Sequence, residues 1–148
     1  MLGLMQSQPL LISSLIDFAD RHHGDAEIVS RRVEGDIHRY TWRGVATRAR
    51  QVAHALDGMN LLFSDRVATL AWNGYRHLEL YFGVSGSGRV LHTINPRLHP
   101  EQIAWIANHA EDQVLCFDMT FLPLIQAIHA RCPGIRQYVA LCEADKLP

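Results

Sequence analysis

Apolar residues recur with helical spacing in the segment that follows Thr41. They fall at offsets of 0, 3, 4, 7, 10, 11 and 14, at Trp42, Val45, Ala46, Ala49, Val52, Ala53 and Leu56. This spacing places them on one face of an α-helix. The opposite face carries Arg43, Arg48, Arg50 and His54. We expect Thr41 to cap this helix, and Gly58 and Asn60 are candidates for the left-handed conformation at its end.

A shorter helix and a hairpin are predicted before it. Ser13 or Ser14 is expected to cap the first helix, and Gly24 to end it. The apolar face of this helix comprises Leu11, Leu15, Phe18 and Ala19. Two runs with strand character, residues 26–32 and 37–41, flank a turn at residues 33–36, which favours an antiparallel hairpin.

Strands and helices then alternate to the end of the chain. The strands are predicted at residues 66–72, 90–94, 114–118 and 137–141, and the helices at residues 75–88, 100–110 and from Thr120 to the Pro133-Gly134 pair. Such alternation predicts a parallel sheet with right-handed crossovers, and the continuous apolar runs fit strands covered on both faces. We therefore expect a single α/β domain over residues 1–148, with three layers, a mostly parallel sheet that has a mixed edge, and a small N-terminal hairpin.

Composition narrows the class of protein. The chain has 148 residues, of which 48% are hydrophobic and 20% charged, which is typical of a globular domain. The net charge of −1 provides no basic field for nucleic acid. Of the 14 basic residues 13 are Arg, and the single Lys is Lys146.

The cysteines and the uncharged N-terminal residues indicate the cellular compartment in which we expect the protein. Three cysteines, an odd number without metal spacing, favour reduced thiols. The first charged residue is Asp17, but the uncharged run Met1 to Ile16 is interrupted by Gln, Ser and Pro. It makes a poor signal peptide and is too short and too polar to span a membrane. We expect a cytoplasmic protein without a membrane span.

Candidate chemistry is sparse. The stretch GVSGSG, from Gly83 to Gly88, lacks the order of a dinucleotide fingerprint and the Gly-Lys of a phosphate loop, so we interpret Gly83 and Gly86 as sites of close helix packing. A nucleophile elbow around Ser85 would need glycine at position 87, which is Ser87. The nine histidines form no ligand pattern, so no metal site is expected.

Two asparagines follow predicted strands and allow two interpretations. Asn73 and Asn95 could lie in the ligand crevice of a doubly wound sheet. Asparagine also starts turns and caps helices, and Pro96 directly after Asn95 forces a turn. We favour the second interpretation.

The stretch from "RVATLAWNGYRHLELYFG" to "VLHTINPRLHPEQIAWI" resembles the N-terminal region of AMP-forming acyl-CoA synthetases. The motifs "LAWN", "HTINPRL" and "PEQIAWI" together are similar to the subgroup of medium- and long-chain fatty-acid–CoA ligases and methylmercaptopropionate–CoA ligases. The resemblance covers nearly the whole chain. It implies a Rossmann-like, incomplete N-terminal domain of a longer ligase.

The same resemblance implies which functional parts this chain lacks. Full-length family members use ATP, Mg²⁺ and CoA to form an acyl-adenylate and then a thioester. Their phosphate loop and catalytic lysine lie beyond the equivalent of Pro148. We therefore expect no catalytic, cofactor-binding or metal residues here, an inactive fragment, and the remainder of a ligase chain as a partner.

One departure from the family pattern lies in the link "GMNLLFSDRV". Asn60 and Ser64 stand where family members usually have glycine, and Phe63 where they have proline. Leu61, Leu62 and Phe63 make the link apolar, which favours a homodimer. The uncharged run Met1 to Ile16 is a candidate for exchange between two copies.

Two alternatives to the ligase fragment remain open at this point. One is a non-catalytic α/β module for dimerisation or interaction. The other is a small-molecule-binding doubly wound domain, which would require a ligand near Asn73 or Asn95.

Overall fold

The computed structural model describes residues 3–4 and 6–147. The helices are α1 (Ile12–His23), α2 (Trp42–Gly58), α3 (Tyr75–Ser85), α4 (Pro100–His109) and α5 (Leu122–Ile128), with 3₁₀ turns η1 (Met119–Phe121), η2 (His129–Arg131) and η3 (Ala144–Lys146). The strands are β1 (Glu27–Arg31), β2 (Ile37–Thr41), β3 (Arg66–Leu70), β4 (Val90–Thr93), β5 (Asp112–Phe117) and β6 (Gln137–Ala140).

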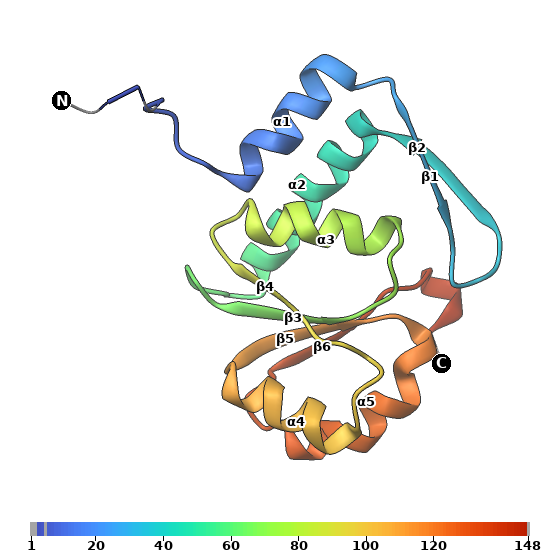
Figure 1. Cartoon of the computed structure of the whole chain (residues 1–148). Helices are drawn as coiled ribbons and strands as arrows, with labels where there is room; N and C mark the ends of the chain where they lie inside the picture. Colours follow the sequence, from blue (N-terminus) through green and yellow to red (C-terminus); the bar gives the residue numbers. More distant parts are fainter. Residues whose placement is uncertain (1–2, 5, 148) are drawn as a thin grey trace.

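A four-stranded sheet forms the middle layer. Its strand order is β4-β3-β5-β6, and α1, α2 and α3 lie on one side of it while α4 and α5 lie on the other (Figure 1). All three strand pairings in this sheet are parallel, which confirms the predicted parallel sheet. The antiparallel pairing expected at its edge lies instead in the separate hairpin sheet of β1 and β2.

The central strands β3 and β5 have core on both faces. Val67 and Val114 pack with Leu56 of α2 and Leu80 of α3 on one side. On the other side, the adjacent strand residues pack with α4 and α5, in a cluster that includes Ala68, Leu70, Leu115, Ile103 and Ile125. Alternate strand residues point to opposite faces, so the apolar runs in the sequence follow from burial on both sides.

The helix predicted after Thr41 is confirmed as α2. The Thr41 hydroxyl accepts a hydrogen bond from the backbone N–H of Gly44 at 3.3 Å, as an N-cap does. Val45, Ala46 and Leu56 of the predicted stripe are buried. The cap and the stripe together fix where α2 begins and which face it turns inward.

Gly83 allows α3 to approach α2 closely, as predicted. A Cβ atom at this position would lie 2.6 Å from Cβ of Val52 and 2.7 Å from the carbonyl oxygen of Ala49. The prediction is wrong for Gly86, which is exposed beyond the end of α3. There a Cβ would meet the carbonyl oxygen of Phe82, in its own turn, at 2.5 Å.

The first helix differs from its prediction in two respects. The N-cap is Leu11, whose side chain has no polar atom, and the Ser14 hydroxyl donates to the Leu11 carbonyl at 2.6 Å instead of capping the helix. The predicted apolar face also lies outward, since Leu15 and Phe18 are 60% and 57% exposed while Ile16 is buried. Periodicity identified the helix but not the face that packs on the protein.

The last predicted helix begins as a 3₁₀ turn. Residues Met119–Phe121 form η1, and α5 continues from Leu122. Phe121, Ile125 and Ile128 are buried in the core that the sheet shares with α4. The predicted helix is therefore confirmed, but its regular part starts later and ends at Ile128, where the 3₁₀ turn η2 follows.

The link between α2 and β3 holds two residues in the left-handed region. Asn60 has φ 55° and Ser64 has φ 67°, at the two positions where the family pattern has glycine. Asparagine tolerates this region, but for serine its Cβ makes the conformation unfavourable by ~1–2 kcal/mol. The backbone at Ser64 is held there by its N–H, which donates to the Gly88 carbonyl at 2.8 Å.

Ser64→Gly is therefore expected to stabilise the fold. Relief of the left-handed cost outweighs the greater entropy of glycine in the unfolded chain, for a net gain of about 0.5–1 kcal/mol. Urea unfolding followed by circular dichroism measures it. The matched control, Ser85→Gly within α3, should instead lose about 0.5 kcal/mol. A loss of stability in Ser64→Gly would contradict this account of the link.

Candidate functional site

The sheet topology defines one crevice where a ligand would be expected. The helix after β3, α3, lies on one side of the sheet, and the helix after β5, α5, lies on the other (Figure 1). The carboxyl ends of β3 and β5 are adjacent strand ends from which the chain leaves in opposite directions. Ligands of open α/β sheets bind at such a switch point.

The two strand ends at this crevice contact each other and leave a hollow of about 30 Å³, with Trp72 and Asp118 in its walls. The backbone N–H of Trp72, just past β3, donates to Oδ2 of Asp118, just past β5, at 2.7 Å. The Trp72 ring lies against Phe121, with ring centroids 5.0 Å apart. Asp118 is 4% exposed, and this burial raises its pKa. The arrangement joins the ends of the two strands.

Asn95 takes the structural role that we favoured. Its side-chain oxygen accepts a hydrogen bond from the backbone N–H of Arg97 at 3.0 Å, which closes the turn after β4. The turn places the Arg97 guanidinium 5.6 Å from the centroid of the Trp72 ring. The predicted turn role is therefore confirmed for Asn95.

Asn73 instead lies at the rim of a hollow between β1 and α3. The hollow measures about 260 Å³, and its walls include Ile28, Val29 and Tyr81. Under it, Nε2 of the buried His77 lies 3.0 Å from the Thr69 hydroxyl, and burial lowers the pKa of His77. This contact between His77 of α3 and Thr69 of β3 supports the packing of the helix on the sheet.

An ionic network ties the hairpin to α3 and to the C-terminal segment. Arg76 of α3 lies 2.9 Å from Glu34 in the hairpin turn and 3.3 Å from Glu143. Arg32 contacts Asp36 at 2.6 Å and Glu143 at 3.1 Å, and the hydrogen bond from Arg32 lowers the pKa of Asp36. Glu143 thus links the end of the chain to both arginines.

The glycine-rich stretch does not fit a phosphate. Gly86 and Gly88 follow the C-terminal end of α3, where the helix dipole disfavours an anion. The Ser87 hydroxyl donates to the carbonyl of Val84 at 2.9 Å, and Ser85 is the last residue of α3 rather than a strand-to-helix elbow. These groups form the C-terminal end of α3.

The remaining candidate groups are the possible metal ligands and the single lysine. In the part of the chain that the structure describes, no group of three or more His, Cys, Asp or Glu residues is placed to hold a metal ion. Lys146 is exposed beside Asp145, at 3.6 Å. The expectation that this chain carries no site residues stays a prediction, because a site shared with further residues would not be visible here.

The sequence interpretation missed one group at the crevice. Asp118 was included in a predicted strand, whereas it is a buried carboxylate directly after β5. The signal was available, because an acidic residue immediately after an apolar strand falls at the carboxyl edge of a parallel sheet.

Comparison with solved structures identifies the class to which this fold belongs. The chain matches the anthranilate–CoA ligase AuaEII, solved in complex with anthranoyl-AMP, with a TM-score of 0.80 at 23% identity over 93% of this chain and 27% of that one. A fatty acyl-CoA synthetase of Mycobacterium tuberculosis gives a TM-score of 0.75 at 20% identity over 88% and 26%. The fold is that of the N-terminal domain of adenylate-forming enzymes.

Sequence comparison then gives the family. A family model described as "AMP-binding enzyme" matches residues 16–144, so the chain belongs to the AMP-binding enzyme family. It is 53% identical to a 3-methylmercaptopropionyl-CoA ligase of Ruegeria pomeroyi over 99% of this chain, and 50% identical to a medium-chain-fatty-acid–CoA ligase of Ectopseudomonas oleovorans over 95%. These matches confirm the resemblance found in the sequence. The chain spans 27% and 26% of the lengths of these two relatives.

Proposed function

We propose that this chain is the first part of an acid–CoA ligase and serves as scaffold for a site completed by residues outside it. The identity of 53% over 99% of the chain to a relative named as such a ligase carries the proposal. The contact between Trp72 and Asp118 supports a scaffold role, because the hollow that remains beside it at the switch point measures about 30 Å³, well below the ~300 Å³ of small ligand pockets. Residues 1–148 then form a single but incomplete domain.

ATP, Mg²⁺ and CoA belong to this proposal as cofactors of the longer protein. The glycine-rich stretch at the C-terminal end of α3 does not suit a phosphate, and no step of the reaction is assigned to the side chains described above. We place the protein in the cytoplasm, where its free cysteines Cys116, Cys132 and Cys142 would stay reduced.

The isolated chain is expected to be inactive. Acid-dependent ATP–pyrophosphate exchange, measured over a series of aliphatic acids, should not rise above the signal of a buffer blank. The physical reason is the lack of a phosphate-binding loop and of a lysine near the sheet. Exchange that co-purifies with this chain through a second column would refute the scaffold proposal.

We further propose that the chain pairs with itself. Leu62 and Phe63 in the link are 72% and 84% exposed, and Val90 at the start of the edge strand β4 is 47% exposed. Exposed apolar side chains beside an unpaired sheet edge favour association. Exchange of the run Met1 to Ile16 stays a prediction, because residues 1, 2 and 5 lie outside the described part.

Gel filtration coupled to light scattering tests the pairing. We expect a mass about twice 16.8 kDa at micromolar concentration, falling toward the monomer on dilution. Phe63→Ser should shift this equilibrium toward the monomer. A constant mass near 16.8 kDa at every concentration would contradict the proposal. The same outcome would weaken the alternative of a non-catalytic dimerisation module.

A further inference from the structure

The hairpin of β1 and β2 forms a small sheet of its own and docks on the rest of the protein through side chains. The four-stranded sheet is separate from it. The hairpin lies beside α3, and its turn lies near the C-terminal segment (Figure 1). At the start of α3, the backbone N–H of Tyr75 donates to the Ser30 hydroxyl of β1 at 3.1 Å. Because a two-stranded hairpin alone is marginally stable in water, its order depends on its contacts with the rest of the protein.

An aromatic stack around His38 of β2 joins the hairpin to α3. The His38 ring stacks on the Tyr75 ring, with centroids 3.8 Å apart and the two planes 20° from parallel. Tyr40 meets both rings edge-on, with centroids 4.7 Å from His38 and 5.9 Å from Tyr75. Aromatic pairs of this kind stabilise a contact beyond the area that they bury. The docking contact therefore contains an imidazole, whose charge can change near neutral pH.

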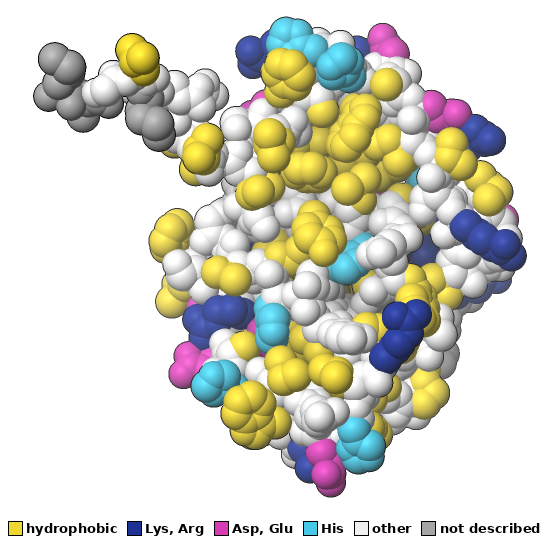
Figure 2. All heavy atoms as spheres, in the orientation of Figure 1, with side chains coloured by type: hydrophobic (Ala, Val, Ile, Leu, Met, Phe, Trp, Pro, Cys, Tyr) yellow, Lys and Arg dark blue, Asp and Glu magenta, His cyan; other side chains and the backbone are white. Residues whose placement is uncertain are grey.

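The surroundings of His38 favour its neutral form. Nε2 of the ring is buried and has no hydrogen-bond partner among the described residues. Burial lowers the pKa of His38, and the positive charges of Arg32 and of Arg48 on α2 lower it further. Arg76 on α3 acts in the same direction, while Asp36 in the hairpin turn acts against it. Figure 2 shows further basic side chains along the edge of the molecule where the hairpin lies.

The carboxylates near this contact are paired with arginine. A hydrogen bond from Arg32 lowers the pKa of Asp36. Burial raises the pKa of Glu34, but hydrogen bonds from its own backbone N–H and from Arg76 lower it overall. Glu143 lies 3.1 Å from Arg32 and 3.3 Å from Arg76. Mild acidification to pH 5.5 therefore leaves Glu34 and Asp36 ionised.

Two further titratable side chains beside the stack do not imitate His38. Burial raises the pKa of Tyr40, so its phenol stays neutral in this pH range. Burial also raises the pKa of Glu79 on α3, against the opposing effect of Arg48. A carboxyl group with a raised pKa adds stability as the pH falls. The effect of Glu79 therefore has the opposite sign to the effect of a histidine whose pKa is lowered.

From this arrangement we propose that protonation of His38 releases the hairpin from α3. In the docked state the new N–H at Nε2 is buried without an acceptor, and the imidazolium lies among three guanidinium groups. In the undocked state His38 lies in water, where imidazole has its ordinary pKa of about 6.5. The undocked state therefore binds the proton at a higher pH than the docked state. Docking is fully stable at neutral pH and weakens as the pH falls below about 6.5.

Hydrogen exchange of single amides, followed by NMR between pH 7.5 and 5.5, tests the proposal. Each rate is corrected for the pH dependence of intrinsic exchange. The Tyr75 amide reports docking directly because it donates to Ser30, and the amides of β1 and β2 report the order of the hairpin. Their protection should fall several-fold by pH 5.5. The limit is about tenfold, because pH 5.5 lies one unit below the ordinary pKa of imidazole. Amides of β3 and β5 should not follow this change.

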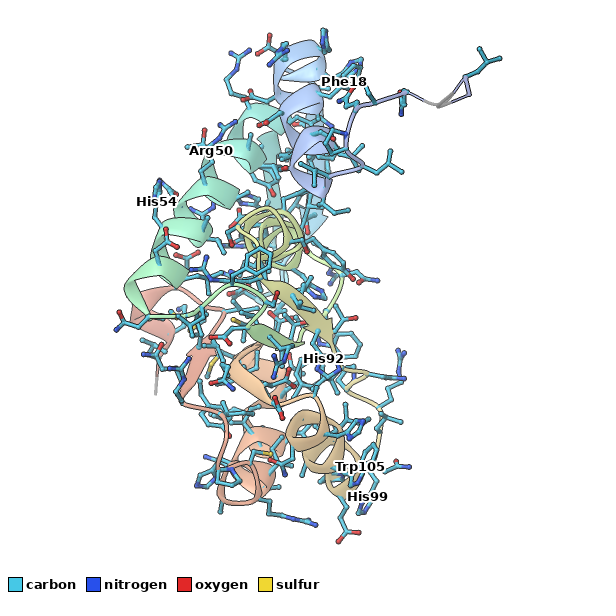
Figure 3. All side chains as sticks on the ribbon, turned by 90° about the vertical axis from the view of Figure 1, so that its left-hand side faces the viewer. Phe18, Arg50, His54, His92, His99 and Trp105 are labelled. Carbon is cyan, nitrogen blue, oxygen red and sulfur yellow. The ribbon has the colours of Figure 1, made fainter. Side chains whose placement is uncertain are left out.

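Three variants assign the change to His38. His38→Phe keeps a ring on Tyr75 without a titratable nitrogen, so protection should no longer depend on pH. His38→Gln should also lose the pH dependence, with lower protection throughout because the ring is absent. The matched control is His54→Phe, since His54 is 84% exposed and points away from α2 (Figure 3); it should behave like the wild type. Constant protection in the wild type down to pH 5.5 would overturn the proposal. So would a fall that persists in His38→Phe, which would assign it to another group such as the buried His77.

Discussion

Arg48→Ala is expected to destabilise the folded chain by about 2–3 kcal/mol at pH 8, because it leaves a buried carboxylate without its partner. Nε of Arg48 on α2 donates to Oε1 of Glu79 on α3 at 2.6 Å. The side chain of Glu79 is 4% exposed and that of Arg48 is 52% exposed. Because Arg48 is half exposed, we expect the loss in the free energy of unfolding to be smaller than the ~3–5 kcal/mol that is typical when a fully buried pair is broken.

The loss should depend on pH in a defined direction. Burial raises the pKa of Glu79 above its ordinary value of 4.5, and the hydrogen bond and charge of Arg48 oppose that rise. A carboxyl group with a raised pKa binds its proton more readily in the folded state, so its ionisation removes stability as the pH rises. Without Arg48 the pKa rises further. The difference between the variant and the wild type is therefore small near pH 4 and grows toward pH 8.

Arg50→Ala is the matched control on the same helix. Arg50 pairs with Asp17 at 3.0 Å, and both of these side chains are more than half exposed. Arg50 also lies 3.5 Å from Asp20, which keeps a second partner in Arg43 at 3.9 Å when Arg50 is removed. An exposed pair of this kind contributes ~0–1 kcal/mol, so Arg50→Ala should change stability little at any pH. Urea unfolding of both variants at pH 4.5, 6 and 8 measures the contrast. Equal and pH-independent losses would show that the Arg48–Glu79 pair is not buried as described.

Replacing both partners distinguishes an unpaired charge from lost packing. Arg48→Met combined with Glu79→Leu removes the pair but keeps apolar volume, and such replacements are often neutral or stabilising. We expect this double variant to recover most of the stability that Arg48→Ala loses. Failure to recover it would assign the loss to packing around α2 and α3.

Local signals in the sequence were sufficient for much of the fold. The stripe after Thr41 and the hydroxyl of Thr41 predicted the position and the inner face of α2, because both depend on residues within a few positions of each other. The apolar runs of β3 and β5 predicted strands with core on both sides for the same reason.

The remaining features of the fold depend on contacts between segments that are distant in the sequence. The apolar face of α1 was read correctly as a helix face, but whether it packs inward depends on α2 and α3, which no local pattern describes. The Arg48–Glu79 pair joins residues 31 positions apart, and the Trp72–Asp118 contact joins residues 46 apart. Spacing along the chain does not reveal either pair.

At the candidate site, too, some features follow from the local sequence and others depend on contacts between distant segments. Asn95 could be assigned to a turn from the proline that follows it, and the structure confirms that role. The position of Asp118 directly after an apolar strand was a local signal for the carboxyl edge of the sheet, but its contact with Trp72 depends on β3 and β5 being neighbours. The ligase family, in turn, was indicated by the motifs rather than by any catalytic group.

The most direct test of the central claim is a chimeric ligase. The 146 residues of this chain that match the Ruegeria pomeroyi 3-methylmercaptopropionyl-CoA ligase, at 53% identity, replace the corresponding segment of that enzyme. If the chain is the scaffold of such an enzyme, the chimera should form acyl-CoA within about tenfold of the parent rate, a difference of ~1.4 kcal/mol in the barrier.

One further variant and one further measurement make the result decisive. A chimera with Leu70→Asp, which buries a charge in the fully buried position of β3, should lose folding and activity together. Circular dichroism on the unaltered chimera establishes that it is folded with a cooperative thermal transition. The account predicts acid-dependent thioester formation by that folded chimera. A folded chimera that forms no thioester from any acid the parent accepts would contradict the claim that this chain is the scaffold of an acid–CoA ligase.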